Sequence, residues 1–252
     1  MEQVGKRKDT AGVVFVHGLG GFAEKRFLGK RIEYFRGMKA AMAQWGIPAF
    51  FPEQPAFGSV IDRADALAAN LAQVPYEQLY FVAHSMGGLD CRYFISKLDV
   101  QRRVRGLATV ATPHRGTPVA TWILKTSGLV QTLLRWRTEK ALTELTPEAC
   151  RHFNEQFPDR SDVRYISYAG VRPLSEMPSW FQPWTRPLSA QAVENDSQVP
   201  LSSAVWAECK GVVRADHIEL AGWNFGRTDP HIQRPFDHLS FYQRVIAELL
   251  GS

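Results

Sequence analysis

Short apolar runs rich in β-branched and aromatic residues alternate along this chain with longer amphipathic stretches. Between the first runs, Met38 to Trp45 and Ile61 to Leu71 carry apolar residues at helical spacing. Buried strands that alternate with helices are typical of a mostly parallel sheet flanked by helices on both faces, an α/β architecture. We expect strands over 12–16, 47–51, 78–83, 106–111 and 163–169, with a last strand between 205 and 213.

Two segments interrupt this alternation. An amphipathic stretch over about 119–140 is inserted between expected strands, and the stretch over about 173–188 contains four prolines together with Trp180 and Trp184. We expect the second stretch to be too rich in proline for regular structure. The two segments either pack on the surface of the core or form a small cap above the carboxyl ends of the strands, where functional loops gather.

The composition is that of an ordinary globular protein. The 252 residues, of which 45% are hydrophobic and 22% charged, suffice for one domain over 1–252 with a sizeable core. The net charge of +5 comes from Lys and Arg spread along the chain, with short clusters only at 6–8 and 102–103. This pattern lacks the basic patch of nucleic-acid-binding proteins and leaves at most a weak attraction to anionic interfaces.

Cysteine usage and hydropathy predict neither a metal cluster nor a membrane span. Cys91, Cys150 and Cys209 are an odd number without a close pair, which allows one disulfide but does not imply it. No apolar run reaches the roughly 20 residues of a transmembrane helix. The first residues lack the apolar region of a secretory signal, which points to the cytoplasm, although a secreted mature form would look the same. We expect no cofactor.

The apolar run over 78–83 leads directly into Ser85, and an apolar helix follows. A serine on a sharp turn between a strand and a helix is typical of a nucleophile elbow, which exposes Oγ at the carboxyl edge of a sheet. Such a turn needs small neighbours, and Ala83 and Gly87 stand two residues before and after the serine. Ala83 replaces the commoner glycine and is still small. Ser85 is therefore the predicted nucleophile.

A serine nucleophile of this type needs two N–H donors for the negative charge that develops on the substrate oxygen. One donor comes from the residue after the nucleophile, which is Met86. The other comes from a loop after an early strand, and the glycine-rich segment 17–22 follows the first expected strand. Leu19 is the predicted second donor. We expect His17 and His84 to shape the loop and the turn by hydrogen bonding, not to act as the base.

The acid is expected after the serine and before the base. Asp196 lies in a short polar turn followed by an extended apolar segment, which suits a carboxylate at the end of a strand. Asp159 and Asp162 precede an expected strand and should lie at the opposite edge of the sheet. Asp216 stands beside His217, and adjacent side chains rarely meet in an orienting geometry. Asp196 is therefore the predicted acid.

The predicted base is His217, because it follows the stretch expected to hold the last strand. His114 comes directly after an expected strand, but it precedes the predicted acid and so breaks the expected order. His238, near the C-terminal helix, is the reserve candidate. The remaining histidines considered are His152 and His231.

With these residues in place, the chain resembles the bacterial triacylglycerol lipases of the Pseudomonas–Burkholderia true-lipase group, which have the α/β-hydrolase fold. The resemblance covers most of the chain and rests on motifs that are weak singly and specific together. It matches Ser85, Asp196 and His217 to the catalytic triad, and Leu19 and Met86 to the oxyanion donors. The matching motifs lie at 17–22, 34–38, 45–47, 83–88, 111–117, 142–147, 153–154, 195–196 and 217–219.

The chain also departs from this family. The region after Thr117 is shorter than the family's lid region, and Ser202 and Ser203 stand where the family has a disulfide cysteine. The resemblance implies a structural calcium held by two aspartates, but Glu219 matches one of them only as a carboxylate and has no evident partner. We therefore expect Asp216 and Glu219 to be solvated or to cap backbone groups, and no metal to bind.

Together these residues predict a serine hydrolase of carboxylic esters, and the resemblance points to acylglycerols. The expected partners are a small-molecule or lipid ester and a lipid–water interface, without nucleic acid; no oligomeric state is predicted. Alternatives are a hydrolase of a phospholipid or polyester, an acyltransferase on the same triad, and a non-catalytic scaffold for acylated ligands. The candidates for lining an acyl groove, or equally for ordinary packing, are Leu129, Leu133, Leu134 and Trp136.

Overall fold

A parallel sheet forms the centre of the computed structural model, which describes residues 11–27, 29–126, 129–177, 179, 182–189 and 193–251. Within these residues the sheet has six strands in the order β4-β1-β5-β6-β7-β8, and every neighbouring pair runs parallel. The expected positions of the strands and the predicted α/β fold class are confirmed. The strands are β1 (Ala11–Val16), β4 (Ala49–Phe50), β5 (Gln78–His84), β6 (Val104–Val110), β7 (Arg164–Gly170) and β8 (Glu208–Val213).

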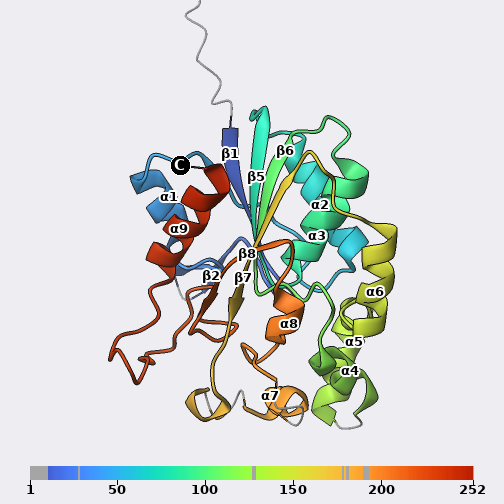
Figure 1. Cartoon of the computed structure of the whole chain (residues 1–252), viewed down its shortest axis with the longest axis vertical. Coiled ribbons are helices and arrows are strands. Elements are labelled where there is room, and N and C mark those ends of the chain that lie inside the picture. Colours follow the sequence, from blue (N-terminus) through green and yellow to red (C-terminus); the bar gives the residue numbers. More distant parts are fainter. Residues whose placement is uncertain are drawn as a thin grey trace, which may run out of the picture.

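Helices cover both faces of the sheet (Figure 1). Val13 and Phe15 of β1 face the cluster that contains α1 and α9, whereas Val14 and Val16 face the cluster that contains α2 and α3. Because both faces are covered, the central strands are apolar at successive positions and do not alternate with polar residues. The helices of these two layers are α1 (Met38–Gln44) with α9 (His238–Leu250), and α2 (Val60–Leu71) with α3 (Gly87–Tyr93) and the π-helix η1 (Phe94–Leu98).

A further group of helices lies beyond the carboxyl ends of the strands and joins the core through a third apolar cluster. This cluster packs Met86 and Leu89, at the start of α3, against Val119 and Ile123. Contacts of α4 with both α5 and α7 hold the group together. Its helices are α4 (Pro118–Lys125), α5 (Leu129–Glu144) and α7 (Gln182–Ser189). Of the two remaining helices of the described residues, α6 (Pro147–Gln156) contacts α5, and α8 (Leu201–Ala204) contacts β7.

The expectation that 173–188 lacks regular structure is wrong. The segment contains the 3₁₀ turn η2 (Leu174–Glu176) and the helix α7, which has Pro187 inside it. Pro183 lies in the first turn of α7, where no N–H needs an intrahelical partner. Leu188 is fully buried in the third cluster, so tertiary packing stabilises a short helix that its own composition disfavours. Trp180 and the side chain of Trp184 lie outside the described residues.

A small hairpin after the N-terminal strand was not predicted from the sequence. The strands β2 (Glu24–Phe27) and β3 (Lys30–Glu33) pair as an antiparallel hairpin outside the main sheet. Their sequences, EKRF and KRIE, are too charged to give a period-two apolar signal. None of the helices in the described ranges is both long enough and apolar enough to pass through a membrane.

Candidate active site

Three parallel strands and one loop bring the candidate residues to the same edge of the sheet. Ser85 directly follows β5, and the loop of Leu19 follows the neighbouring β1. Asp196 and His217 follow β7 and β8, which are adjacent strands on the other side of β6. Carboxyl ends of parallel strands form the ligand-binding edge in open α/β sheets. The order of the strands thus explains how residues so distant in sequence meet.

Ser85 has the backbone of a nucleophile elbow. Its φ of 57° lies in the left-handed region, which non-glycine residues rarely adopt. The Ser85 N–H donates to the carbonyl of Val110 at 2.9 Å, and the Ser85 carbonyl accepts from Oγ1 of Thr112 at 2.8 Å. A Cβ on Gly87 would lie 2.6 Å from the carbonyl oxygen of Val16. Close packing of Gly87 against the backbone of β1 therefore explains why this position needs a small residue.

The side chains of Ser85, His217 and Asp196 form a continuous hydrogen-bonded chain. Nε2 of His217 lies 2.9 Å from Oγ of Ser85, and Nδ1 of His217 lies 2.7 Å from Oδ2 of Asp196. The second oxygen of Asp196 accepts from the N–H groups of Gln198 and Val199 at 3.0 and 2.7 Å. Since a carboxylate only accepts, Nδ1 of His217 carries the proton, and Nε2 is free to accept the serine proton.

The predicted oxyanion donors have unused N–H groups. Within the described part of the chain, neither the Leu19 nor the Met86 N–H donates a hydrogen bond. The loop of Leu19 is fixed on its far side, where the Gly20 N–H donates to the carbonyl of Ala56 at 2.6 Å. Unpaired donors on a fixed backbone beside a nucleophile are what an oxyanion hole requires.

His17 and His84 occupy positions beside the chain of three residues. Nδ1 of His17 lies 3.0 Å from the Gly18 carbonyl, and burial with the nearby Arg63 lowers the pKa of His17 to about 4. Nδ1 of His84 lies 2.8 Å from the Tyr34 hydroxyl, and the ring centroid of His84 lies 4.6 Å from that of His217. Burial lowers the pKa of His84 well below its usual value. Both rings are therefore neutral at pH 7 and act through shape and hydrogen bonding.

Each of the other candidate acids pairs with an arginine. Asp159 accepts from Arg92 at 2.9 Å, and Asp162 accepts from Arg160 at 2.8 Å. Asp216 adjoins His217 in sequence, but it pairs with Arg227 at 2.6 Å.

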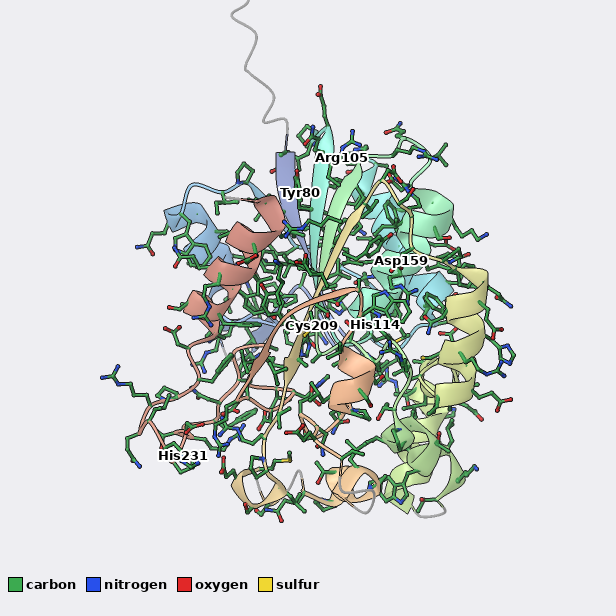
Figure 2. All side chains as sticks on the ribbon, in the orientation of Figure 1. Tyr80, Arg105, His114, Asp159, Cys209 and His231 are labelled. Atoms are coloured by element: carbon green, nitrogen blue, oxygen red, sulfur yellow. The ribbon has the colours of Figure 1, made fainter. Side chains whose placement is uncertain are left out.

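The other candidate bases also have partners of their own. His114 is buried and stacked on Trp206 with ring centroids 5.0 Å apart, and burial lowers its pKa well below the usual value. His238, the reserve candidate, has its Nε2 2.7 Å from the Arg36 carbonyl. His152 is exposed beside Glu155, and His231 lies on the loop between β8 and α9 that stands away from the sheet (Figure 2).

Trp136, a candidate for lining an acyl groove or equally for ordinary packing, is 79% exposed. The buried stripe of α5 contains Thr138, Ala141 and Leu142, and helical geometry turns Trp136 away from that stripe. The side chains of the other three groove candidates, Leu129, Leu133 and Leu134, lie outside the described residues.

Apolar residues that the sequence reasoning missed lie closer to the site. Val119, Ile123 and Leu188 are in one buried cluster with Met86, and half-buried Leu19 packs against it. The amphipathic pattern of 118–125 could have indicated the first two. Leu188 follows a proline in a segment without an apolar period, and so gave no signal.

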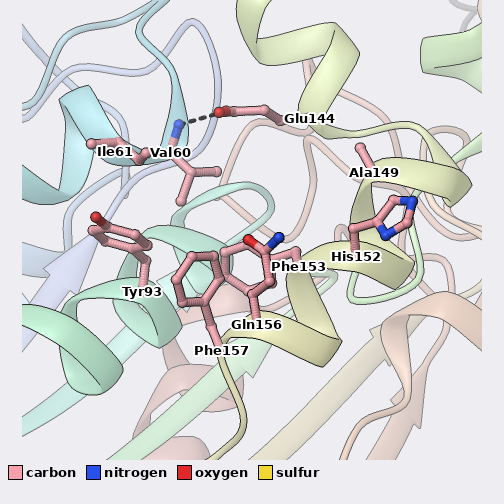
Figure 3. A pocket seen from close by; sticks show the side chains of 9 residues that line it. All are labelled: Val60, Ile61, Tyr93, Glu144, Ala149, His152, Phe153, Gln156 and Phe157. Atoms are coloured by element: carbon pink, nitrogen blue, oxygen red, sulfur yellow. Dashed lines mark hydrogen bonds between the residues drawn. The ribbon is translucent and has the colours of Figure 1, made fainter.

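A hollow of about 450 Å³ lies between α2, α3 and α6 (Figure 3), and none of the three candidate triad residues lines it. Tyr93, Phe153 and Phe157 form its aromatic walls, and Glu144 accepts from the Val60 N–H at 2.6 Å on one side. Its lining residues provide no serine or cysteine nucleophile beside a base. The hollow therefore does not compete with the edge of the sheet as the reaction site.

The carboxylates near His217 do not fit the calcium site that the family resemblance implies. Of the two expected roles, solvation or capping, both carboxylates take the second: Asp216 accepts from the Glu219 N–H, and Glu219 accepts from the Asp216 N–H. Both side chains are buried and paired with Arg227 and Arg172. Among the described residues, no group of three or more metal-ligating side chains is placed to hold an ion.

The model of the alpha/beta hydrolase fold family matches residues 13–158, which include Ser85 and both candidate oxyanion donors. The chain belongs to the alpha/beta hydrolase family. It is 29% identical over 247 residues to triacylglycerol lipase 2 of Saccharomyces cerevisiae, covering 86% of this chain and 73% of the yeast protein.

Solved structures agree with this assignment at the level of the fold. Mature Bacillus licheniformis lipase BlEst2 superposes with a TM-score of 0.71 at 18% identity, covering 97% of this chain and 96% of that one. Staphylococcus hyicus lipase gives 0.71 at 17% identity, covering 99% and 97%. The metagenomic carboxyl esterase MGS0156 gives 0.73 at 19% identity, covering 97% and 77%. With the yeast relative and the family match, this hydrolase is a carboxylic-ester hydrolase of the lipase/esterase type.

Proposed function

We propose that this hydrolase cleaves acylglycerols through an acyl-enzyme on Ser85, with His217 as base and Asp196 as its orienting acid. The observation that carries the proposal is the pair of hydrogen bonds made by His217, at 2.9 Å to Ser85 and 2.7 Å to Asp196. A base that contacts both a nucleophile and a carboxylate is the geometry of serine-dependent acyl transfer.

In the first half of the reaction, Nε2 of His217 removes the proton of Ser85 as Oγ attacks the ester carbonyl carbon. The negative charge moves to the carbonyl oxygen, which accepts from the N–H groups of Leu19 and Met86. Each such donor is worth roughly 3 kcal/mol to the transition state. The tetrahedral intermediate then breaks its bond to the alcohol oxygen, and His217 gives that oxygen the proton taken from Ser85.

In the second half, water replaces the alcohol. His217 removes a proton from the water as its oxygen attacks the acyl carbon, and the same two N–H groups stabilise the second oxyanion. Collapse breaks the bond to Oγ of Ser85, and the proton on His217 returns to the serine. The products are a carboxylic acid and the free enzyme, and Asp196 stays ionised throughout.

The surroundings of Met86 are apolar, which suits an acyl chain. Buried Val119, Ile123 and Leu188 pack in one cluster with this predicted oxyanion donor, and apolar surface favours a hydrocarbon over water. We propose that α4, α5 and α7 form the cap of a single domain over 1–252 and meet lipid at a lipid–water interface. The motifs shared with the Pseudomonas–Burkholderia lipases, and the yeast relative named as a triacylglycerol lipase, support this substrate class.

Covalent labelling tests the nucleophile. A fluorophosphonate probe is expected to label the wild-type protein at Ser85, as located by peptide mass spectrometry, and to leave Ser85→Ala unlabelled. The exposed residue Ser240 provides a control, and Ser240→Ala should label like the wild type. A folded wild-type protein that resists the probe would overturn the proposal.

A rate series tests the substrate class. On p-nitrophenyl esters from C2 to C16, we expect activity to continue into the long chains. Activity confined to C2–C6 would reject acylglycerols of long fatty acids and leave a short-chain esterase.

A further inference from the structure

The loop that carries His217 is held in place by a partly buried network of charges. We use the term ion-pair cluster for the following seven side chains: Glu176, Asp229, Asp216, Glu219, Arg172, Arg214 and Arg227. Residues 214–222 follow β8 without forming a helix or a strand. The loop therefore needs contacts outside itself to hold an imidazole within the few tenths of an ångström that proton transfer demands.

Two buried carboxylates fix the shape of this loop from within. Oδ1 of Asp216 accepts from the N–H groups of Ile218 and Glu219 at 3.1 and 3.0 Å. In return, Oε2 of Glu219 accepts from the N–H of Asp216 at 3.0 Å. His217 lies between these two residues, so its backbone is enclosed by a reciprocal pair of caps.

Two carboxylates buried this deeply need positive partners. The two side chains are 0% and 2% exposed, and a buried charge without a partner is strongly unfavourable. Burial and the neighbouring Asp216 raise the pKa of Glu219, while Arg172 and Arg227 oppose that rise. Guanidinium groups thus supply the positive charge that the family resemblance would assign to a metal ion.

Arg172 also reaches the loop of the acid. Its backbone N–H donates to the carbonyl of Asn195, the residue before Asp196, at 2.9 Å. Its Nη2 donates to Glu219 at 2.8 Å and to the carbonyl of Arg214 at 3.2 Å. Its Nη1 donates to Asp229 and Glu176, both at 3.1 Å. One residue therefore connects the segment of Asp196 to both ends of the turn that holds His217.

We propose that Arg172 is a positioning residue that holds His217 in register with Asp196 and Ser85 by neutralising Glu219 and joining the two loops. The inference rests on the role of His217 in the proposed function. Arg172 does not contact the reacting atoms, so its removal should alter the rate of the chemical step while leaving substrate binding largely unchanged.

The test compares Arg172→Met with Arg160→Met. Arg160 also pairs with two carboxylates, those of Asp99 and Asp162, at 3.0 and 2.8 Å, but it lies before β7 at the other edge of the sheet. Both variants lose ion pairs, so both should melt at lower temperature. Only Arg172→Met should lower kcat on a short p-nitrophenyl ester, by about 10- to 100-fold with KM within about twofold, because small misplacements of catalytic groups have effects of this size. Arg172→Lys should recover part of the kcat.

A spectroscopic readout separates positioning from general destabilisation. The proton between His217 and Asp196 is expected to give a far-downfield proton resonance in the wild type and in Arg160→Met, and to be lost or broadened in Arg172→Met. Equal kcat in the two methionine variants, with the resonance retained in both, would overturn the proposal. If Arg172→Met does not fold, Glu219→Gln serves instead, with the same expected loss of kcat and resonance. Activity in His217→Ala would defeat the proposed function itself, whatever the arginine variants do.

Discussion

At the scale of single residues, the hydrogen bonds of Asp196 decide which ring nitrogen of His217 carries the proton. The carboxylate receives three hydrogen bonds, from Nδ1 of His217 and from two backbone N–H groups. The two backbone N–H groups hold one oxygen of Asp196, so the other oxygen faces Nδ1 of His217 as an acceptor, which places the proton on Nδ1. The lone pair on Nε2 therefore always faces Ser85.

Replacement of this acceptor tests the arrangement. Asp196→Asn keeps the shape, but an amide placed to accept from the two backbone N–H groups presents its NH₂ to Nδ1. The proton of His217 then moves to Nε2, which can no longer take the serine proton. We expect kcat to fall by about 10⁴-fold with KM little changed, as measured by initial rates on a p-nitrophenyl ester. A loss below about tenfold would show that Asp196 does not set the tautomer.

At the scale of elements, the site depends on how closely β1 approaches the start of α3. Gly87 opens that helix, and a Cβ there would meet the backbone oxygens of Val16 and His17 at 2.6 and 2.7 Å. Backbone oxygens cannot rotate away as a side chain can. The absence of a side chain at this position therefore sets the distance between the nucleophile and the oxyanion loop.

Gly87→Ala is accordingly expected to lower both the melting temperature and kcat, the latter by at least about tenfold, because β1 and α3 must separate. Gly211→Ala in β8 is the matched control, since its Cβ would meet only the ring of Tyr168, at an ordinary contact distance of 3.6 Å. Thermal melts and initial rates measure the melting temperature and kcat of the two variants. Similar behaviour of both would contradict the packing argument.

The elements also show how far the sequence can predict this molecule. Continuous apolar runs such as 78–83 identify strands buried on both faces, and the small residues around Ser85 identify the elbow. The same reasoning failed for α7, because the burial of Leu188 outweighs the proline content, and for the charged hairpin of β2 and β3. It also could not find Arg172, since a lone arginine after a strand carries no pattern until the fold brings four acceptors to it.

At the scale of the whole molecule, buried neutral histidines make stability depend on pH. His17, His84 and His114 are each at most 1% exposed, and burial is the largest cause of the lowered pKa of each, to about 4 for His17. Because the folded pKa lies below the unfolded value of 6.5, the stabilisation is complete above pH 6.5. It is lost as the pH falls towards the folded pKa.

For each histidine that stays neutral in the folded protein, the free energy of unfolding should fall by about 2 kcal/mol between pH 7 and pH 5. His114→Gln should therefore lose less stability over that range than the wild type, by about this amount. His152→Gln, at an exposed position, should follow the wild type. Urea unfolding at the two pH values measures the difference, and equal losses in His114→Gln and the wild type would refute the assignment.

The left-handed backbone of Ser85 implies a conflict between folding stability and catalytic activity. A glycine at φ 57° would be unstrained, so selection for folding stability alone would favour replacing the nucleophile. An enzyme that keeps the serine must hold this residue in a backbone conformation that serine rarely adopts. During evolution, a relative released from catalysis would therefore be expected to lose this residue early and to become more thermostable as it does so.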